Sequence, residues 1–230
     1  MSNSEIFLEK YKMLEEAVRI TYNLRNEDSI SHFLSNTNKY KKYVDEIRYC
    51  QDVRNLLSHK KKINQNFAVD ASDEMILFID ELINKIKKRQ KCSDIQIGFK
   101  KVCWRSLSDK VKETMSVMRE KSYTHIPILN DKKEVIGVFD ENSVFMYIAD
   151  EGIVAIDENL TFSQIEKYLS LEGREMESFI FVKPNFYVDE LEDKIEDAFN
   201  KGQRIELAFV TANGSKNEKL QGIISPLDLI

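Results

Sequence analysis

Glycine and proline are missing from the first part of the chain. No glycine occurs before Gly98 and no proline before Pro127, so all seven glycines and all three prolines lie in the C-terminal part. These residues interrupt regular structure more strongly than any others. Their absence over 97 residues predicts long helices joined by polar turns. The whole sequence also lacks a Gly-rich phosphate loop, a nucleophile elbow, a CxxC pair and an HExxH motif.

Cysteines and long apolar runs are also scarce. The three cysteines, Cys50, Cys92 and Cys103, have spacings of 42 and 11 residues, which fit neither a disulfide framework nor a zinc site. They are expected to be reduced thiols, with no metal bound. No run approaches the roughly 18 apolar residues of a membrane span, and the N-terminus carries charges where a signal peptide needs an apolar segment. We therefore expect a soluble, cytoplasmic protein with no membrane partner.

The charge of the chain is divided unevenly. Residues 1–92 carry 17 basic and 14 acidic residues, a net charge of +3, whereas residues 93–230 carry 17 and 25, a net charge of −8. The total of −5 argues against a purely electrostatic nucleic-acid binder. The shift in composition places a domain boundary in the polar run 91–95.

Apolar spacing in residues 1–92 predicts a bundle of about four helices. One helix covers residues 6–24, a short one 29–35 and a third runs from Tyr40 to Leu57. Ser72 is expected to cap a fourth helix, which carries apolar residues from Met75 to Ile86 and ends in the basic run KIKKRQK.

Beyond this bundle the pattern changes to short β-rich runs between amphipathic helices. The same order of strand, helix, strand, strand and helix is predicted twice, at 97–150 and 179–230, around a joining segment at 151–178. The predicted elements are strands at 102–104, 124–129, 135–139, 179–182, 205–211 and 220–224, and helices near 106–121, 142–149 and 188–201. Only two copies are present, so the repeat is a paired module rather than a solenoid.

The two copies align at their ends. His125–Leu129 (HIPIL) matches Glu206–Val210 (ELAFV), and the run GVFDENS from Gly137 matches GIISPLD from Gly222. In these motifs the second region resembles a pair of CBS domains, named after cystathionine β-synthase. The predicted fold class is therefore a multi-domain α plus α/β protein, with a helical bundle followed by a tandem CBS pair.

The residue types of GIISPLD suit an anionic or sugar ligand. Glycine lets the chain turn closely, and a hydroxyl at a helix start caps the helix or bonds a phosphate. A carboxylate three residues later can accept two hydrogen bonds from a vicinal diol. The resemblance implies an adenosine-containing ligand (AMP, ADP, ATP or S-adenosylmethionine) as effector, with no cofactor required. Its implied binding residues are Gly222, Ser225, Asp228, Val182, Lys183, Pro184, Leu207 and Ala208.

A purely structural role for the same residues stays open. Ser225 then caps the last helix and Asp228 adds a first-turn charge. In the first copy Asp140 stands in the place of the hydroxyl residue and Ser143 in the place of the acid. Since a carboxylate repels phosphate, we expect one ligand site per chain.

A second motif lies late in the third predicted helix. Arg54 and His59 are separated by four residues, with Asn55 directly after the arginine. This is similar to the Arg-x4–6-His motif of HEPN domains, helical bundles that often dimerise and are in many cases metal-independent ribonucleases. A guanidinium can hold a phosphodiester, and an imidazole can exchange protons near neutral pH. The resemblance implies Arg54 and His59 as catalytic residues, Asn55 in support and RNA as substrate, with Lys60–Lys62 extending the positive surface.

In the alternative interpretation both residues are structural. Arg54 forms a salt bridge to Asp52 or to a neighbouring helix, and His59 is a cation at a helix end. The leading hypothesis is a homodimeric, nucleotide-sensing protein whose CBS pair controls the helical domain. The alternative is a non-enzymatic regulatory or dimerisation module whose helical domain recruits a protein partner. The sequence leaves open which nucleotide binds and whether it activates or inhibits.

Overall fold

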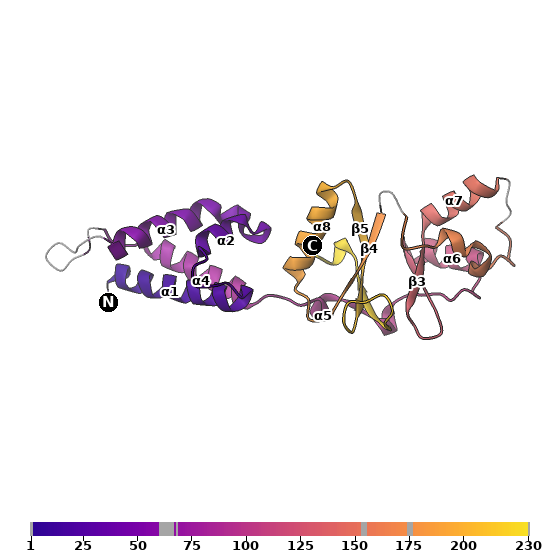
Figure 1. Ribbon diagram of the computed structural model, residues 1–230, viewed down its shortest axis with the longest axis horizontal. Coiled ribbons are helices and arrows are strands. Elements are labelled where there is room, and N and C mark those ends of the chain that lie inside the picture. Colours follow the sequence, from indigo (N-terminus) through magenta and orange to yellow (C-terminus); the bar gives the residue numbers. More distant parts are fainter. Residues whose placement is uncertain (1, 60–66, 68, 153–155, 174–176, 230) are drawn as a thin grey trace. The chain divides into compact units, whose positions relative to one another are not determined.

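The computed structural model describes residues 2–59, 67, 69–152, 156–173 and 177–229. Contacts divide the chain into two compact units, Met1–Arg89 and Gln90–Ile230, which we describe separately. The first unit is helical and the second mixes helices with strands (Figure 1).

The N-terminal unit packs its helices around one apolar core. Its described elements are α1 (Asn3–Tyr22), α2 (Ile30–Asn36), the 3₁₀ helix η1 (Asn38–Tyr43), α3 (Val44–His59) and α4 (Asp73–Lys87). Helices α1 and α4 run in the same direction: Asn3 bonds Asp73 at 2.9 Å, and one heptad further on Lys10 meets Asp80 at 2.7 Å. The core includes the fully buried side chains of Phe7, Val18, Leu34, Ile79 and Ile86.

Local capping explains where two of these helices begin. Ser2 caps α1 in a reciprocal box with Glu5. The predicted cap of the fourth helix is confirmed, because Ser72 accepts a hydrogen bond from the Met75 amide at 3.4 Å. The third helix is shorter than predicted: residues 38–43 form a tighter 3₁₀ turn that buries Tyr40, and α3 starts at Val44 with Asp45 and Glu46 in its first turn.

The C-terminal unit contains two small sheets. The larger has the strand order β1 (Ile97–Gly98), β6 (Leu220–Ile224), β5 (Arg204–Thr211), β4 (Glu177–Val182), with β4 and β5 parallel and the other pairs antiparallel. The smaller pairs β2 (Ile126–Leu129) with β3 (Val135–Phe139) in antiparallel fashion. The helical elements are α5 (Cys92–Ile95), η2 (Phe99–Lys101), α6 (Val111–Lys121), α7 (Glu141–Glu151), η3 (Phe162–Tyr168), α8 (Val188–Asn200) and η4 (Pro226–Leu229).

The sheets of the two copies share a core. Leu129, Val135 and Val138 of the smaller sheet pack in one cluster with Leu207, Phe209 and Leu220 of the larger one. In both copies the first paired segment lies parallel to the next strand: Arg105 forms a parallel bridge with Ile128, as β4 does with β5. The two copies therefore bury their apolar sheet faces against each other.

Two predicted boundaries in the first copy were wrong. No strand forms at 102–104, since only Arg105 joins the smaller sheet, by exchanging hydrogen bonds with Pro127 and Leu129. Helix α6 starts at Val111 instead of 106. The intervening residues make a turn in which the Asp109 carboxylate accepts bonds from the Ser106 amide and hydroxyl at 2.6 and 3.0 Å.

The aligned glycines Gly137 and Gly222 each lie where the segment that precedes the other copy passes close to the strand. This segment is near Leu169 at Gly137 and is Gln96–Ile97 at Gly222. A β-carbon on Gly137 would approach the Leu169 carbonyl oxygen to 2.6 Å, and the next residue, Val138, donates its amide to that same oxygen at 2.9 Å. A β-carbon on Gly222 would lie 2.7 Å from the Ile97 carbonyl oxygen. These glycines are therefore required by close backbone approach within a strand, not by a turn.

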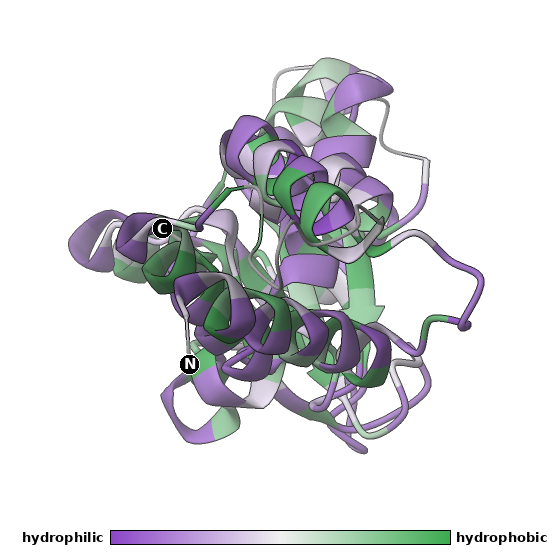
Figure 2. Cartoon of the chain, turned by 90° about the vertical axis from the view of Figure 1, so that its left-hand side faces the viewer, coloured by the Kyte–Doolittle hydropathy of each residue, from purple (hydrophilic) through white to green (hydrophobic). Residues whose placement is uncertain are grey.

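Hydropathy follows this packing. The helices carry hydrophobic residues on one side and hydrophilic residues on the other (Figure 2). Among the described residues, no helix is long and apolar enough to span a membrane.

Candidate functional site

A pocket of about 590 Å³ opens in the C-terminal unit. It brings together residues from both copies of the repeat: the start of the first copy, the segment before β2, the beginning of β5 and the end of β6. The lining residues are Ile97, Lys101, Val102, Cys103, Ser122, Tyr123, Thr124, His125, Glu206, Leu207, Ile223, Ser225, Pro226 and Leu227. Its walls combine apolar side chains with hydroxyls, an imidazole and one charge of each sign, as small-molecule sites do.

Ser225 and Asp228 form a closed pair at one wall of this pocket. The amide and the hydroxyl of Ser225 both donate to Asp228 Oδ2, at 2.7 and 2.8 Å, and the Asp228 amide donates back to the Ser225 carbonyl at 3.0 Å. The bond from the Ser225 amide to the Asp228 carboxylate is one half of a capping box, and the bond between the Asp228 amide and the Ser225 carbonyl lies in the short turn η4. Both residues are half-buried, and Ser225 lines the pocket. The cap therefore holds the serine hydroxyl and the carboxylate together at the cavity.

The first copy also bonds an aspartate to a serine at this place, with the two residue types exchanged and with a complete capping box. Asp140 caps α7, and its Oδ1 accepts bonds from the Ser143 amide and hydroxyl, each at 2.8 Å. Here the pair is closed off, since Asp140 is 3% and Ser143 1% exposed. Ser225 of the second copy lines the 590 Å³ pocket, whereas Asp140 and Ser143 do not line it.

The other residues implied by the CBS resemblance lie in two places. Leu207 lines the pocket, and Gly222 lies at the β1–β6 crossing beside it. Val182 and Ala208 are buried in a separate cluster with Leu191 and Val210. The loop after β4 contacts the segment before β1, where the Pro184 carbonyl accepts a hydrogen bond from the Ser93 amide at 2.9 Å. Val182, Lys183 and Pro184 are not among the residues that line the 590 Å³ pocket.

Several lining residues carry no motif in the sequence. Lys101–Cys103 and Ser122–His125 come from the first copy and reach the motif of the second only through the fold. His125 Nδ1 lies 2.9 Å from Thr124 Oγ1, and its ring stands edge-on to Phe179 at 6.1 Å. One signal existed: His125 and Glu206 occupy equivalent positions in the aligned copies, and both line the pocket.

In the N-terminal unit, Arg54 lies on α3 beside a small cavity of about 100 Å³. Its Nη2 is 3.5 Å from Glu15 Oε1 on α1, and its Nη1 donates to Asn55 Oδ1 at 3.3 Å. The arginine therefore has the partner on a neighbouring helix that the structural alternative predicted. His59 is the last residue of α3, but its side chain and Lys60–Lys62 lie outside the described residues. The Arg54–His59 constellation thus stays a prediction.

Burial raises the pKa of three residues of the apolar cores. It raises the pKa of the Tyr11 hydroxyl to about 12, assisted by the negative charge of Glu15. It also raises the pKa of the Cys50 and Cys92 thiols to about 11. Both thiols therefore stay protonated and unreactive near neutral pH. The described residues contain no group of His, Cys, Asp and Glu side chains placed to hold a metal ion.

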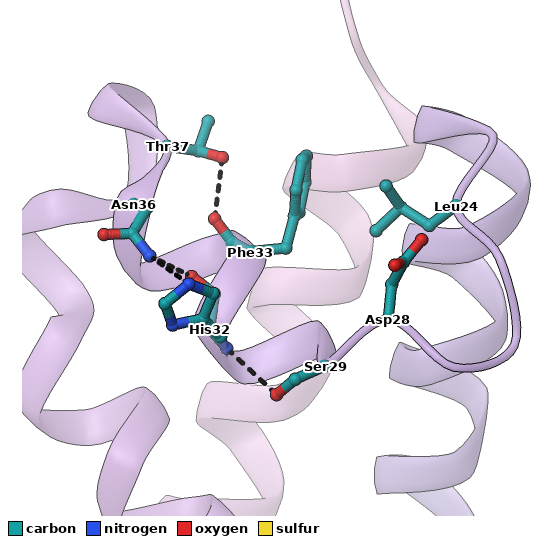
Figure 3. Close-up of a pocket in the computed structure, with 7 residues that line it drawn as sticks. All are labelled: Leu24, Asp28, Ser29, His32, Phe33, Asn36 and Thr37. Carbon is teal, nitrogen blue, oxygen red and sulfur yellow. Dashed lines mark hydrogen bonds between the residues drawn. The ribbon is translucent and has the colours of Figure 1, made fainter.

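Another open pocket, of about 460 Å³, lies along α2 in the N-terminal unit (Figure 3). Asn36 Nδ2 lies 3.2 Å from His32 Nε2 and donates to the His32 carbonyl at 2.8 Å, and Ser29 caps the helix at the His32 amide. Leu24 and Asp28 stand on the opposite side. These polar groups bond within one short helix, so the pocket presents mainly local capping rather than a converging set of reactive groups.

Comparison with known proteins finds one family. A model of the CBS domain matches residues 106–150. No curated protein matches the chain. The solved structures that resemble it include a hemolysin-like protein containing a CBS domain from Oenococcus oeni, at 16% identity and a TM-score of 0.42, covering 61% of this chain and 88% of the other.

Two further similar structures contain ligands. The CBS domain pair of protein MJ0100, in complex with 5′-methylthioadenosine and S-adenosylmethionine, is 17% identical with a TM-score of 0.41, covering 61% of this chain and 93% of the other. CBSX2 in complex with AMP is 12% identical with a TM-score of 0.42, covering 60% and 92%. The family match and the pocket thus coincide in one unit of the chain.

Proposed function

We propose, from the CBS domain at residues 106–150 and the pocket that it helps to line, that the C-terminal unit is a regulatory module that binds one adenosine-containing ligand. The observation that carries this proposal is the position of Ser225: the hydroxyl of the GIISPLD motif lines a 590 Å³ cavity to which the matched domain contributes Ser122–His125. A cavity of this size is within the range of small-molecule sites.

The Ser225–Asp228 pair gives the ligand contacts their chemistry. Asp228 uses Oδ2 for the serine, which leaves Oδ1 to accept a hydrogen bond from a ribose hydroxyl. The serine oxygen keeps lone pairs for a ligand donor while its proton holds the carboxylate. Leu207 and Ile223 supply apolar surface for the base. Val182, Lys183 and Pro184 stay proposed contacts for adenine, and Gly222 and Ala208 shape the strands beside the site.

Binding is expected at one site per chain. The matching pair of the first copy, Asp140 and Ser143, is buried, and a carboxylate takes the place of the hydroxyl that would bond a phosphate. We propose a homodimer in which AMP, ADP, ATP or S-adenosylmethionine acts as effector rather than as cofactor. Ligand binding would then shift the population of dimer arrangements through its different affinity for each.

For the helical unit we propose a HEPN-like domain that cleaves RNA with Arg54 and His59, supported by Asn55. What supports it is a helical unit of about 90 residues with Arg54 partly exposed beside a polar cavity. The second candidate is a non-enzymatic domain that recruits a protein partner. The ion pair of Arg54 with Glu15 favours this second function, because it gives the arginine a purely structural task.

The first test measures the thermal midpoint of the full chain with AMP, ADP, ATP and S-adenosylmethionine. A ligand present at about 100 times its Kd adds about 2.7 kcal/mol to stability. Asp228→Ala should abolish the rise, whereas Asp131→Ala, an exposed change in the same unit, should keep it. No rise with any ligand would leave the module as a scaffold.

The second test measures cleavage of labelled RNA with and without the bound ligand. Arg54→Ala and His59→Ala should each abolish cleavage in a nuclease-free preparation. Cleavage that is unchanged in both variants would rule out the catalytic assignment. Absence of cleavage in the unmodified protein would favour the partner-recruiting function.

A further inference from the structure

The charges that line the 590 Å³ pocket nearly cancel. Among its lining residues, Lys101 is the basic side chain and Glu206 the acidic one, while the imidazole of His125 and the hydroxyls of Ser122, Thr124 and Ser225 are further polar groups. Asp228, bonded to Ser225 at 2.8 Å, adds a second carboxylate behind the wall. Lys101 is therefore opposed by the carboxylates of Glu206 and Asp228, and these side chains give the pocket wall no excess of positive charge.

Of the two charged side chains that line the pocket, Glu206 is the less exposed to solvent. Its side chain is 21% exposed and lies near the start of β5, in the larger sheet. Its ion-pair partner, Arg204 Nε at 3.3 Å, belongs to a side chain that is 62% exposed, and Arg204 does not line the pocket. Lys101, in contrast, is an exposed side chain at the end of η2. The carboxylate is thus held in a less hydrated place than the ammonium group.

These charges disfavour the binding of a polyphosphate in the pocket. A polyphosphate brings several negative charges close to the partly desolvated carboxylate of Glu206, where Coulomb repulsion is stronger than in open water. The exposed guanidinium of Arg204 offsets this repulsion only in part, because solvent screens its charge. One exposed lysine offsets a single charge. A neutral nucleoside meets no such repulsion, and a cationic substituent gains an attraction to Glu206.

We infer that the pocket takes an adenosine ligand without a polyphosphate, neutral or positively charged at its 5′ end, and that Glu206 is the specificity-determining residue. This inference rests on the proposed adenosine site and deepens it. Ser225 and Asp228 serve the part that all adenosine ligands share, whereas Glu206 separates those ligands by the charge of their 5′ substituent.

The test is isothermal titration of the full chain with four probes: 5′-methylthioadenosine, S-adenosylmethionine, AMP and ATP. The neutral and cationic probes should bind at least tenfold more tightly than ATP, with AMP between them. Glu206→Gln keeps the size of the side chain and one acceptor oxygen but removes the charge. It should reduce the preference for S-adenosylmethionine over ATP at least fivefold. Glu120→Gln, an exposed change on α6, should leave that preference unchanged.

The outcomes separate this inference from the proposed function. Tighter binding of ATP than of 5′-methylthioadenosine, or an unchanged preference in Glu206→Gln, overturns the inference and leaves an adenosine site in place. Binding of none of the four probes overturns the proposed function itself. Circular dichroism of the Glu206→Gln variant establishes that any loss is not a loss of folding.

Discussion

Close contact at single residues determines how the two copies of the repeat fit together. Gly222 is the sharpest case, because a β-carbon there would meet Gln96 Oε1 and lie 2.7 Å from the Ile97 carbonyl oxygen. Gly222→Ala should lower the free energy of unfolding of the C-terminal unit by about 1–3 kcal/mol, the usual cost of overpacking. Gly98→Ala is the matched control, since nothing lies within 4 Å of its added carbon and its φ of −63° suits alanine. Urea unfolding measures both, and equal effects would contradict the steric explanation.

A second residue-scale prediction concerns alkaline stability. The pKa of Tyr11 rises from 10.0 to about 12 on folding, chiefly because the hydroxyl is buried. Between these values the unfolded chain loses its proton before the folded one, so the free energy of unfolding falls as pH rises from 10 to 12. The tyrosine contributes up to roughly 2–3 kcal/mol to this fall. Tyr11→Phe should make it smaller in urea unfolding monitored by helix signals, and an unchanged pH profile would contradict this account.

At the scale of elements, prediction succeeds where the pattern is local. The strands at 135–139 and 220–224 and the cap at Ser72 follow from alternation and capping chemistry within a few residues, and the structure has them at the predicted places. Strand β1 has two residues and pairs with β6, more than 120 positions away, so no local sequence pattern predicts it. The same holds for the candidate site: the residue in a local motif was predicted, and residues brought together from distant segments were not. The motif indicated Ser225, but the pocket walls from Lys101 to Cys103 come from the fold alone.

The Ser72 cap of helix α4 is expected to contribute to the stability of the N-terminal unit. Ser72 accepts the Met75 amide, and without it one of the first amides of the helix lacks a protein partner. Ser72→Ala should destabilise the N-terminal unit by about 1 kcal/mol. Ser58→Ala, an exposed position in the last turn of α3, should change stability by less than about 0.5 kcal/mol. Thermal unfolding followed by circular dichroism compares the two, and an equal loss would argue against the capping contribution.

At the scale of the whole molecule, two units of opposite charge share one chain, and the proposed ligand site belongs to only one of them. A ligand stabilises the unit whose unfolding releases it. An adenosine ligand should therefore slow amide hydrogen exchange in β5 and β6 and in residues 97–103 and 122–125, which surround the pocket.

The central turns of α1 and α4 provide the internal control for this exchange experiment. Their amides are protected by the separate core of the N-terminal unit, around Phe7 and Ile79, so ligand should leave their exchange unchanged. Slower exchange there, to the same extent as in β5, would mean that both units unfold as one cooperative body. Regulation would then act through the stability of the helical unit. If the helices stay unchanged, the result supports the proposed action of the ligand on the arrangement of chains in a homodimer, which sedimentation with and without ligand would test.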